Sequence, residues 1–328
     1  MSTATMTAGV ATEDGLAVRQ VPRPEAGPEQ VLVRVRAAGL NRADLGAAQG
    51  RYIPSPEALS RPIGLEWAGE VAGVGEGVKG IKEGDRVLAS GSGGYAEYAV
   101  ADMGRVLPIP ANNMSYEQAA GLPIALLTMH NAVVTMGRMQ KGDAVLIQGA
   151  SSGVGLMGLQ IAKAMGAALV IGSSTNDARR ARLGDFGADF AINSRDEGWA
   201  DAVVEATGGD GVHLIVDMIS AGVMDDNMKA TRVRGRIVNV GRLGGFTGEF
   251  NFDLHALKRI DYIGVTFRTR SVDEVREIVR SMHGDLWDAV TAGEISLPID
   301  KTFALDDAVA AHAHMRANEH FGKIILTA

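Results

Sequence analysis

The chain contains no cysteine, and this absence excludes several kinds of chemistry at once. Disulfide bonds, thiolate zinc sites, iron–sulfur clusters and cysteine nucleophiles all require a thiol. The sequence also has no run of basic residues: 32 Lys and Arg stand against 39 Asp and Glu, which gives a net charge of −7. Nucleic-acid binding relies on concentrated positive charge that neutralises phosphates. We therefore expect no nucleic-acid partner.

Residues 1–15 lack two features of a secretory signal, a basic start and an apolar core. We therefore expect a cytoplasmic protein. An uncharged stretch between Glu117 and Arg138 is just long enough to span a bilayer. Pro123, His130 and Asn131 interrupt this stretch. We interpret it as a buried helix and expect no membrane segment.

The length and the composition indicate two folded domains. The chain has 328 residues, whereas one domain usually has roughly 100 to 200. Hydrophobic residues make up 46% and charged residues 22%, as in ordinary globular proteins. From Gln30 the segment VLVRVRAAGL alternates apolar and basic residues, and short apolar runs separated by glycines follow between Gly64 and Val100. This pattern predicts a compact antiparallel barrel of short strands.

The pattern changes at about residue 120, after a capped helix start at Ser115 with Gln118 three positions on. Strand and helix signals then alternate, which predicts a doubly wound parallel sheet. The predicted elements are strands in DAVLIQGA, ALVIGS, FAINS, HLIVDM, GRIVNVG and YIGVTF, and helices in VGLMGLQIAKAMG, residues 178–186 and residues 273–292. The last segment, GKIILTA, is expected to pack back on the barrel. We thus predict an α/β chain in which a Rossmann domain at 121–265 interrupts a mostly β domain formed by 1–120 and 266–328.

A glycine motif marks the start of the second domain. Gly153, Gly155 and Gly158 form GxGxxG directly after a predicted strand and at the start of a predicted helix. In that context the glycines allow a tight turn, a close approach of backbone to a pyrophosphate and close packing of the helix on the sheet. The N-terminus of the helix then faces the anion. We therefore expect a dinucleotide site, with Ser152 among its contacts.

The residues after the next strand indicate which dinucleotide binds. NAD sites place a carboxylate there, about 20 positions after the first glycine, to bind the adenosine ribose. This chain has Ser173 and Ser174 instead, with Arg179 and Arg180 nearby. Hydroxyls and guanidinium groups can bind a 2′-phosphate through charge-assisted hydrogen bonds. The sequence therefore favours NADPH, although either arginine could instead lie on a solvated helix face.

Together these features resemble the medium-chain dehydrogenase/reductase superfamily, and within it the zinc-independent quinone oxidoreductase branch. The resemblance covers nearly the whole chain and implies a GroES-like fold for the barrel domain. Seven segments carry it: AGLNRADL from Ala38, QGRY from Gln49, PIGLEWAGEV from Pro62, GASSGVG from Gly149, VDMIS from Val216, NVGRLGG from Asn239 and FGKIIL from Phe321.

The resemblance implies that no metal is bound. Zinc-dependent members of the superfamily have a cysteine at the position of Asn41 and a histidine at that of Leu65. Glu66 alone cannot hold a catalytic zinc, so we expect it to be a structural acid. His312 and His314 are two positions apart on a predicted helix and point to nearly opposite faces, so they cannot share an ion.

The resemblance also implies a set of site residues. Asn41 and Tyr52 are expected at the nicotinamide as catalytic residues, although Tyr52 could simply pack in the barrel. Asn318 or Lys323 is expected at the 2′-phosphate or at the domain boundary. Ser194 stands where relatives often have a tyrosine near the adenine, and Arg195 could compensate by stacking. The other expected cofactor contacts are Thr128, Gly153, Val154, Ser173, Arg179, Ser220, Gly241, Arg242, Leu243, Phe267, Arg268 and Thr269.

The expected activity is reduction by NADPH of a quinone or a similar conjugated acceptor. A quinone or an enone spreads developing negative charge itself, whereas an unconjugated carbonyl gains most from a metal. Two alternatives stay open: a reductase of α,β-unsaturated carbonyl compounds, and a non-catalytic NADPH-binding structural or sensor protein. The apolar run from Tyr262 to Phe267 predicts an edge strand that pairs with a second copy. We expect a homodimer, with a tetramer as the alternative.

Overall fold

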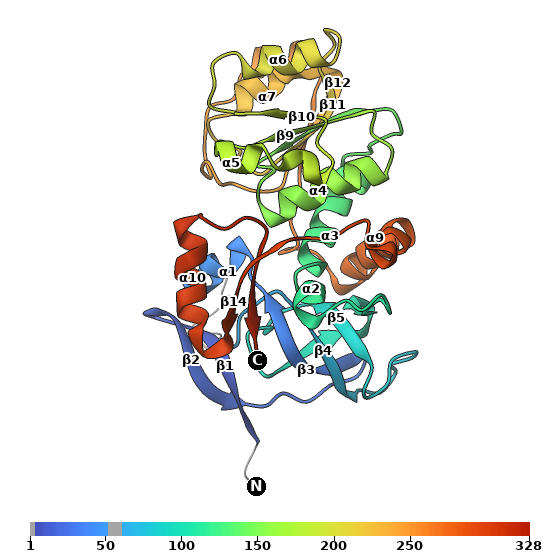
Figure 1. The fold of residues 1–328 in the computed structure, drawn as a ribbon, viewed down its shortest axis with the longest axis vertical. Helices are drawn as coiled ribbons and strands as arrows, with labels where there is room; N and C mark the ends of the chain where they lie inside the picture. The colour runs from blue at the N-terminus through green and yellow to red at the C-terminus, as the bar shows by residue number, and fades with distance from the viewer. Residues whose placement is uncertain (1–3, 52–60) are drawn as a thin grey trace. The chain divides into compact units, whose positions relative to one another are not determined.

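The computed structural model describes residues 4–51 and 61–328, which form two compact units (Figure 1). Unit 1 consists of Met1–Ile124, Val272–Val279 and Val290–Ala328, and unit 2 consists of Ala125–Ser271 and Arg280–Ala289. The sequence placed the boundaries at 120 and 265. The main difference concerns the long helix α9 (Val272–Ala292), which we expected wholly in the first domain. Its central part, Arg280–Ala289, belongs to unit 2.

Unit 1 is built on a mostly antiparallel sheet of seven strands with the order β14-β15-β3-β4-β5-β7, and β6 also pairs with β3. Its strands are β3 (Gln30–Gly39), β4 (Glu66–Val74), β5 (Arg86–Ser90), β6 (Tyr98–Asp102), β7 (Val106–Pro108), β14 (Ile299–Ala304) and β15 (Lys323–Thr327). A separate hairpin of β1 (Thr5–Thr12) and β2 (Gly15–Pro22) and the helices α1 (Arg42–Ala48), α2 (Tyr116–Ala120) and α10 (Ala308–Ala317) complete it. The predicted return of the last segment is confirmed, because Ile325–Thr327 pair with Ala37–Gly39 of β3.

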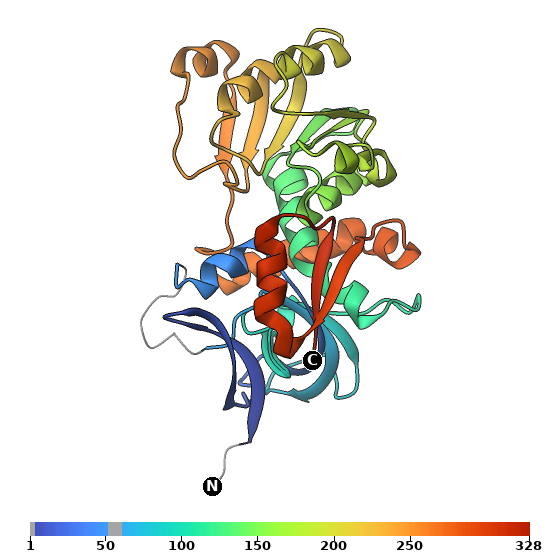
Figure 2. The same ribbon diagram turned by 60° about the vertical axis from the view of Figure 1, so that its left-hand side comes forward.

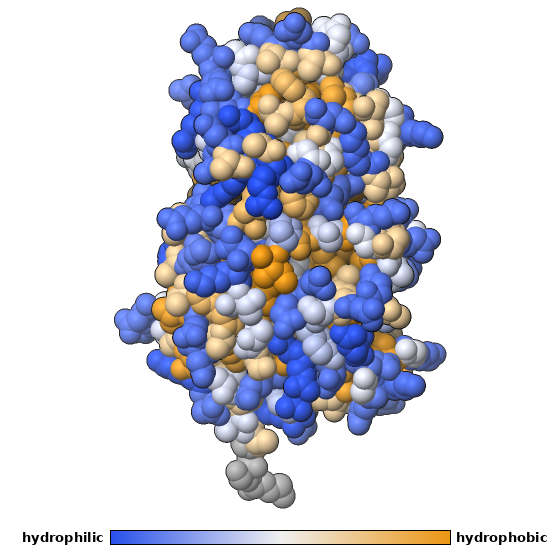
Figure 3. Space-filling model, viewed as in Figure 1, coloured by the Kyte–Doolittle hydropathy of each residue, from blue (hydrophilic) through white to orange (hydrophobic). Residues whose placement is uncertain are grey.

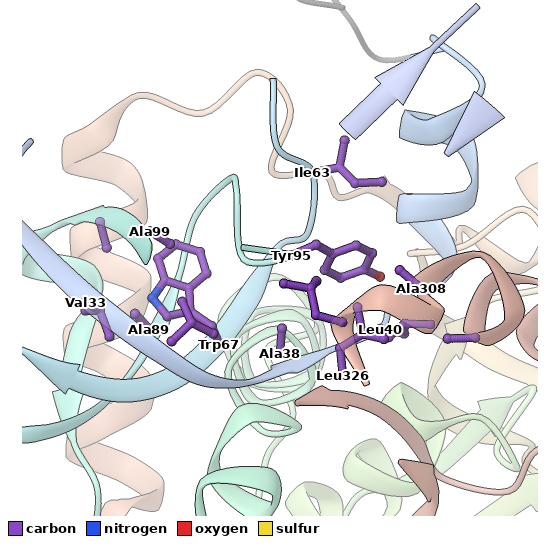
Figure 4. Packing of buried hydrophobic residues seen from close by; sticks show 14 of the residues in the cluster. Val33, Ala38, Leu40, Ile63, Trp67, Ala89, Tyr95, Ala99, Ala308 and Leu326 are labelled. Carbon is purple, nitrogen blue, oxygen red and sulfur yellow. The ribbon is translucent and has the colours of Figure 1, made fainter. Parts of the chain in front are cut away.

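The core of unit 1 is formed by alternate residues of these strands. In Figure 4 Trp67 packs among Val33, Ala89 and Ala99, and all four are buried. The ring of Tyr95 lies near Ala308 of α10 in the same view. Apolar side chains thus occupy the inner positions of the strands, as the alternation in the sequence predicts.

Unit 2 is a parallel sheet of six strands with the order β10-β9-β8-β11-β12-β13. The strands are β8 (Ala144–Gln148), β9 (Leu169–Ser173), β10 (Phe190–Ile192), β11 (Val212–Asp217), β12 (Thr231–Asn239) and β13 (Asp261–Gly264). Figure 2 shows them side by side with helices against the sheet. The helices are α3 (Pro123–His130), α4 (Gly153–Ala164), α5 (Asp177–Arg180), α6 (Trp199–Ala206), α7 (Met224–Ala230) and α8 (Phe252–Lys258). Starting in the centre and reversing direction once is the strand order of a doubly wound dinucleotide-binding fold.

Two helical predictions differ in detail. The helix expected over 178–186 is a four-residue α5 followed by a 3₁₀ turn at Leu183–Phe186. The uncharged stretch forms α2, then α3, then a π-helical segment at Asn131–Met136. Its capped start is confirmed, because Ser115 accepts from the Gln118 backbone N–H at 3.2 Å. Gly121 is the C-cap of α2 and Pro123 is the first residue of α3, so the two helices are separate.

One helical stretch, Tyr116–Met136, is long and apolar enough by composition to cross a membrane. However, 72% of its 18-residue window is buried inside the structure, as in a core helix. Figure 3 shows one face of the molecule, on which hydrophilic residues predominate and hydrophobic residues form small separate patches. The interpretation of this stretch as a buried helix agrees with that burial.

A histidine without polar partners lies in the core of unit 1. Both ring nitrogens of His312 are buried and lack a hydrogen-bond partner among the described residues. The ring meets Tyr95 edge to face, with 5.7 Å between ring centroids. Burial, helped by the positive charge of Arg316, lowers the pKa of His312 to about 4. The folded protein therefore keeps this ring neutral where an unfolded chain would protonate it.

Replacing His312 by leucine should change how stability depends on pH. The unfolded histidine titrates near pH 6.5. As the pH falls from 6.5 to about 4, the unfolded chain therefore takes up a proton that the folded protein does not, and the free energy of unfolding of the wild type decreases. Linkage puts this loss at about 3 kcal/mol. Between pH 7 and pH 4 the free energy of unfolding should decrease in both proteins, and the decrease in His312→Leu should be smaller by about this amount. Urea unfolding at several pH values measures the difference.

The matched control is Met315→Leu, which alters packing on the same helix without removing a titrating group. It should keep the wild-type pH dependence. Equal pH dependence of His312→Leu and the wild type would show that the ring is protonated in the folded state.

Candidate functional site

The turn after β8 forms the first part of the site. Gly149 adopts a left-handed conformation with φ +75°, and Ser152 ends the turn as the N-cap of α4. The Ser152 hydroxyl accepts from the Gly155 N–H at 3.1 Å and donates to the Gly149 carbonyl at 3.0 Å. A helix leaves its first amides without intrahelical acceptors. The cap satisfies that of Gly155, so the amides of Gly153 and Val154 remain to meet an anion.

The roles of the three motif glycines agree only in part with the expected ones. The left-handed turn falls at Gly149, whereas Gly153 is the first residue of α4, so the prediction of Gly153 as the turn glycine is wrong. A Cβ at Gly155 would lie 2.5 Å from the Gly149 carbonyl oxygen, so this glycine lets the helix start close against the turn. A Cβ at Gly158 would lie 2.1 Å from Cε of Met129. That contact supports the expected packing role of Gly158.

Ser173 at the end of β9 and Ser174 directly after it point inward rather than toward a ligand. The Ser173 hydroxyl is buried, donates to Gln148 Oε1 at 2.6 Å and accepts from the Gly149 N–H at 2.9 Å. Ser174 is also buried, and its hydroxyl donates to Ser151 Oγ at 3.0 Å. The expectation that the Ser173 hydroxyl binds a 2′-phosphate is therefore corrected: its hydrogen-bonding capacity is used to hold the Gly149 turn.

The arginines that follow lie on the short helix α5. Asn176 caps this helix by accepting from the Arg179 N–H at 3.0 Å. Arg180 donates from Nη1 to the Ser174 carbonyl at 3.1 Å and pairs with Asp177 at 2.8 Å. The guanidinium of Arg180 is thus held beside the end of β9. Arg179 is half-buried next to it.

The turn after β11 contains a strained residue. Ser220 has φ +68°, a left-handed conformation that is unusual for a residue with a side chain. Its N–H donates to Asp217 Oδ1 at 3.0 Å, and its hydroxyl donates to the Gly241 carbonyl at 2.6 Å. Asn239 donates to the same hydroxyl at 2.5 Å. The turns that hold Ser220 and Gly241 are therefore bonded to each other.

A hollow of about 470 Å³ opens beside this turn within unit 2. Ser220, Arg242 and Asn239 line it together with the aromatic rings of Phe246 and Tyr262. Of the expected cofactor contacts, Ser220 and Arg242 are thus brought together. Leu243, the next residue, is exposed.

The remaining predicted residues of unit 2 lie on separate elements. Thr128 is half-buried on α3, and Ser194 is half-buried in the turn after β10. Phe267, Arg268 and Thr269 follow β13 in an irregular segment. Within that segment the Arg268 N–H donates to Thr266 Oγ1 at 3.2 Å.

In unit 1 the expected catalytic amide of Asn41 belongs to a buried polar cluster. Its Nδ2 donates to Glu66 Oε1 at 3.0 Å and lies 3.5 Å from the Gly39 carbonyl oxygen. Lys323 donates from Nζ to Asn41 Oδ1 at 3.2 Å, to the Leu40 carbonyl at 2.8 Å and to Glu66 Oε1 at 2.5 Å. The Lys323 side chain is 4% exposed and that of Glu66 is fully buried.

One expectation about unit 1, that Lys323 binds a 2′-phosphate, is corrected by this cluster. All three N–H donors of Lys323 have acceptors inside unit 1, so the ammonium cannot bind a 2′-phosphate. Asn318 ends α10 and accepts from Arg42 Nη2 at 2.8 Å. Glu66, expected as a structural acid, also accepts from the Ile124 N–H at 2.7 Å. The expected catalytic residue Tyr52 lies outside the described residues.

A second buried carboxyl group, that of Asp44, is hydrogen-bonded to the backbone of Asn41. Asp44 Oδ2 accepts from the Asn41 N–H and from the Tyr95 hydroxyl, each at 2.8 Å. Burial raises the pKa of Asp44 to about 7, although both hydrogen bonds oppose that shift. Its Oδ1 has no partner among the described residues. Sequence analysis missed this group, since nothing in the local pattern distinguishes a buried aspartate from an exposed one on a short helix.

Within residues 4–51 and 61–328, no group of three or more His, Asp or Glu side chains could hold a metal ion. The expectation that the protein binds no metal stays a prediction.

Comparison with known proteins covers both units. Residues 27–111 match the family described as the alcohol dehydrogenase GroES-like domain, and residues 153–283 match the family described as zinc-binding dehydrogenase. The chain is 30% identical to the quinone oxidoreductase of Rattus norvegicus over 93% of this chain and 91% of that protein. It is also 30% identical to a phenolphthiocerol/phthiocerol polyketide synthase subunit of Mycobacterium tuberculosis over 96% of this chain, but it spans only 14% of that protein's length.

Solved structures share the whole fold. A probable oxidoreductase from Mycobacterium abscessus has a TM-score of 0.86 and 32% identity, and each chain is covered completely. A mycobacterial protein solved in complex with NADPH has a TM-score of 0.87 and 25% identity over 99% of this chain and 100% of that chain. The chain therefore belongs to the medium-chain dehydrogenase/reductase superfamily, in the branch that contains the quinone oxidoreductases.

Proposed function

We propose that the protein is a zinc-independent, NADPH-dependent reductase that transfers hydride to a quinone or a similar conjugated acceptor. The observation that carries this proposal is the capped, glycine-lined start of α4, followed by a β9 end without a carboxylate. The relatives that match most of their own length are quinone oxidoreductases, which supports the acceptor class. The cytoplasmic location expected from the sequence stays a prediction.

The residues of unit 2 fit a dinucleotide. The amides of Gly153 and Val154 offer donors to a pyrophosphate, and the glycine at 155 lets α4 begin against the Gly149 turn. The turns after β11 and β12 hold Ser220, Gly241 and Arg242, and we assign these residues to the ribose and nicotinamide part. That a structural neighbour was solved with NADPH supports the same cofactor here.

The end of β9 supports NADPH over NADH. An NAD site needs a carboxylate at this point for the ribose hydroxyls, whereas Ser173 and Ser174 stand there and are turned inward. Arg179 and Arg180 follow on α5, and Arg180 is held on the Ser174 carbonyl. We assign the 2′-phosphate to Arg179, with Arg180 shaping the loop.

When bound, NADPH supplies the hydride. The side chains of this protein must then stabilise the negative charge that develops on the acceptor oxygen. Asn41 is our candidate donor. One N–H of its Nδ2 is committed to Glu66 at 3.0 Å, while its contact to the Gly39 carbonyl is long, at 3.5 Å. The second N–H has only this long contact and is therefore our candidate donor to an acceptor oxygen.

The neighbours of Asn41 support this role. Lys323 binds the carbonyl oxygen of the amide and Glu66 binds its nitrogen, so the ion pair fixes the orientation of the amide. A cation on the carbonyl oxygen also polarises the N–H bonds and makes them stronger donors. No metal is needed for a conjugated acceptor, because the acceptor spreads the charge over its own π-system.

A screen of acceptors tests the proposed function. The protein should oxidise NADPH with quinones such as 1,4-benzoquinone, at rates that an excess of a strong chelator leaves unchanged. Faster turnover of α,β-unsaturated ketones than of quinones would favour the alternative enone reductase. Binding of NADPH without oxidation by any acceptor would favour a structural or sensor protein. A zinc ion whose removal abolishes turnover would refute zinc independence.

Replacing Arg179 by alanine should separate the two cofactors. A charge-assisted contact to phosphate contributes about 1.5 to 3 kcal/mol, so NADPH affinity should fall roughly ten- to a hundredfold. NADH affinity should hardly change. Fluorescence titration with each cofactor measures both values. Arg180→Ala is the matched comparison and should show a smaller preference change, since that guanidinium is occupied within the loop. An equal loss for both cofactors in Arg179→Ala would contradict the assignment.

We further propose that the protein is a homodimer that pairs through β13. This strand is the edge of the sheet, and Tyr262 on it is 41% exposed. Apolar rings lie beside it: Phe250 contacts Tyr262 at 5.9 Å and Phe252 at 5.1 Å between centroids, and Phe252 is 78% exposed. An unpaired edge with an apolar border favours association with a second copy.

Light scattering at micromolar concentration should therefore give the mass of a dimer. Phe252→Glu should shift the protein toward monomer, because a charge would be buried in the interface. Val309→Glu is the matched control, since Val309 is an exposed apolar residue on α10 of unit 1. A monomeric wild type would contradict the proposal, as would a dimer that Phe252→Glu leaves intact while Val309→Glu disrupts it. A tetramer with the same response of Phe252→Glu would extend it.

A further inference from the structure

A continuous line of buried polar side chains crosses unit 2, and the proposed function does not use it. Ser173 donates to Gln148 at 2.6 Å, Gln148 donates to Asn227 at 2.8 Å, and Asn227 donates to Asp217 at 3.0 Å. These four side chains are between 0 and 1% exposed. They come from β9, β8, α7 and β11. We name this line, Ser173–Gln148–Asn227–Asp217, the polar chain.

Asp217, at one end of the polar chain, determines which group donates and which accepts in each hydrogen bond of the chain. An ionised Asp217 can only accept, so Asn227 must turn its amide nitrogen toward it. The Asn227 oxygen then faces Gln148 and requires the Gln148 nitrogen as donor. The Gln148 oxygen in turn requires the hydroxyl proton of Ser173, whose oxygen is left to accept from the Gly149 N–H. Each of these groups therefore has a fixed role as donor or acceptor. Exchanging donor and acceptor in one hydrogen bond would leave the next hydrogen bond without a donor.

Each end of the polar chain holds a turn of the candidate site. At one end Ser173 Oγ holds the Gly149 N–H at 2.9 Å, in the left-handed turn before α4. At the other end Asp217 Oδ1 accepts from the N–H groups of Ile219 at 2.7 Å and Ser220 at 3.0 Å. Ser220 is the strained residue of its turn. The two turns are thus joined through side chains that no solvent reaches.

We propose that Asn227 is a positioning residue that couples the phosphate-binding turn at Gly149 to the strained turn at Ser220, so that the two form one cooperative unit. Asn227 lies on α7 and contacts neither turn directly; it acts through Gln148 and Asp217. A buried donor or acceptor that loses its partner is costly. Disturbing Asn227 should therefore loosen both turns together. The role of this coupling in cofactor binding rests on the proposed function, whereas the coupling itself does not.

Native-state hydrogen exchange of the cofactor-free full chain tests the coupling. Asn227→Asp keeps the shape of the side chain but replaces the amide donor by a carboxyl group, so that two buried carboxyl groups must either repel each other or share a proton. The amides of Gly149 and Ser220 should both exchange about ten- to a hundredfold faster than in the wild type. Acceleration at Ser220 alone, with Gly149 unchanged, would overturn the proposal.

A matched control separates coupling from general loosening of α7. The Thr231 hydroxyl donates to the Asn227 backbone carbonyl at 2.7 Å and takes no part in the polar chain. Thr231→Val removes this bond beside Asn227 and should leave exchange at Gly149 unchanged. Acceleration at Gly149 in Thr231→Val equal to that in Asn227→Asp would show a purely structural effect and overturn the proposal. If Asn227→Asp does not fold, Gln148→Met breaks the same chain without a new charge, and the same two outcomes apply.

A ligand measurement then tests transmission across the polar chain. The probe is 2′,5′-ADP, which has the adenosine and 2′-phosphate groups but no nicotinamide. In the wild type its binding should slow exchange at Ser220 several-fold, and in Asn227→Asp this protection should be lost while binding is still detected. Protection of Ser220 that persists in Asn227→Asp would overturn the proposal. If neither 2′,5′-ADP nor NADPH binds the wild type, the proposed function fails, and the exchange experiment on the cofactor-free protein still decides the coupling.

Discussion

The pairing of β8 with β9 on one side and with β11 on the other sets the positions of three turns of unit 2: the Gly149 turn, the turn after Ser173 and the Ser220 turn. Parallel strands end at the same edge of a sheet, so the turns after Gln148, Ser173 and Asp217 lie in one row. The strand order reverses at β8, and doubly wound folds bind their ligands at such a switch point. The start of α4 can then present free amides, because the fold brings no strand across them. A chain with the same motif but another strand order would scatter these turns.

Unit 1 depends on a different constraint, the burial of a carboxylate. Glu66 is fully buried, and a buried charge without a partner costs several kcal/mol. The Lys323 ammonium on β15 supplies the opposite charge. Gly39 has no side chain, and this leaves space for the Glu66 carboxylate. Asn41 binds both ions. In the resembling zinc enzymes a cysteine takes the position of Asn41, whereas here the cation held at this position is part of the chain itself.

Local patterns predicted the elements well, and non-local partners were beyond them. The capped start at Ser115 and the strand–turn–helix around Gly153 were predicted, because each depends on residues within a few positions. The resemblance suggested Lys323 for the 2′-phosphate or the domain boundary, and the local pattern suggested the Ser173 hydroxyl for a ligand. Both side chains are instead committed to acceptors far away in the sequence: Lys323 to Glu66, and Ser173 to Gln148. A sequence shows that such groups can bind something, but only the strand order shows what lies next to them.

The strained turn at Ser220 shows why the site is prepared before a ligand arrives. A left-handed conformation costs a residue with a side chain about 1 to 2 kcal/mol. Glycine would avoid that cost but would lose the two hydroxyl contacts, to the Gly241 carbonyl and from Asn239. With the N–H bond to Asp217, three hydrogen bonds of about 0.5 to 1.5 kcal/mol each offset the strain. The turn is therefore already ordered without ligand, and the binding free energy of a cofactor need not be spent on ordering it.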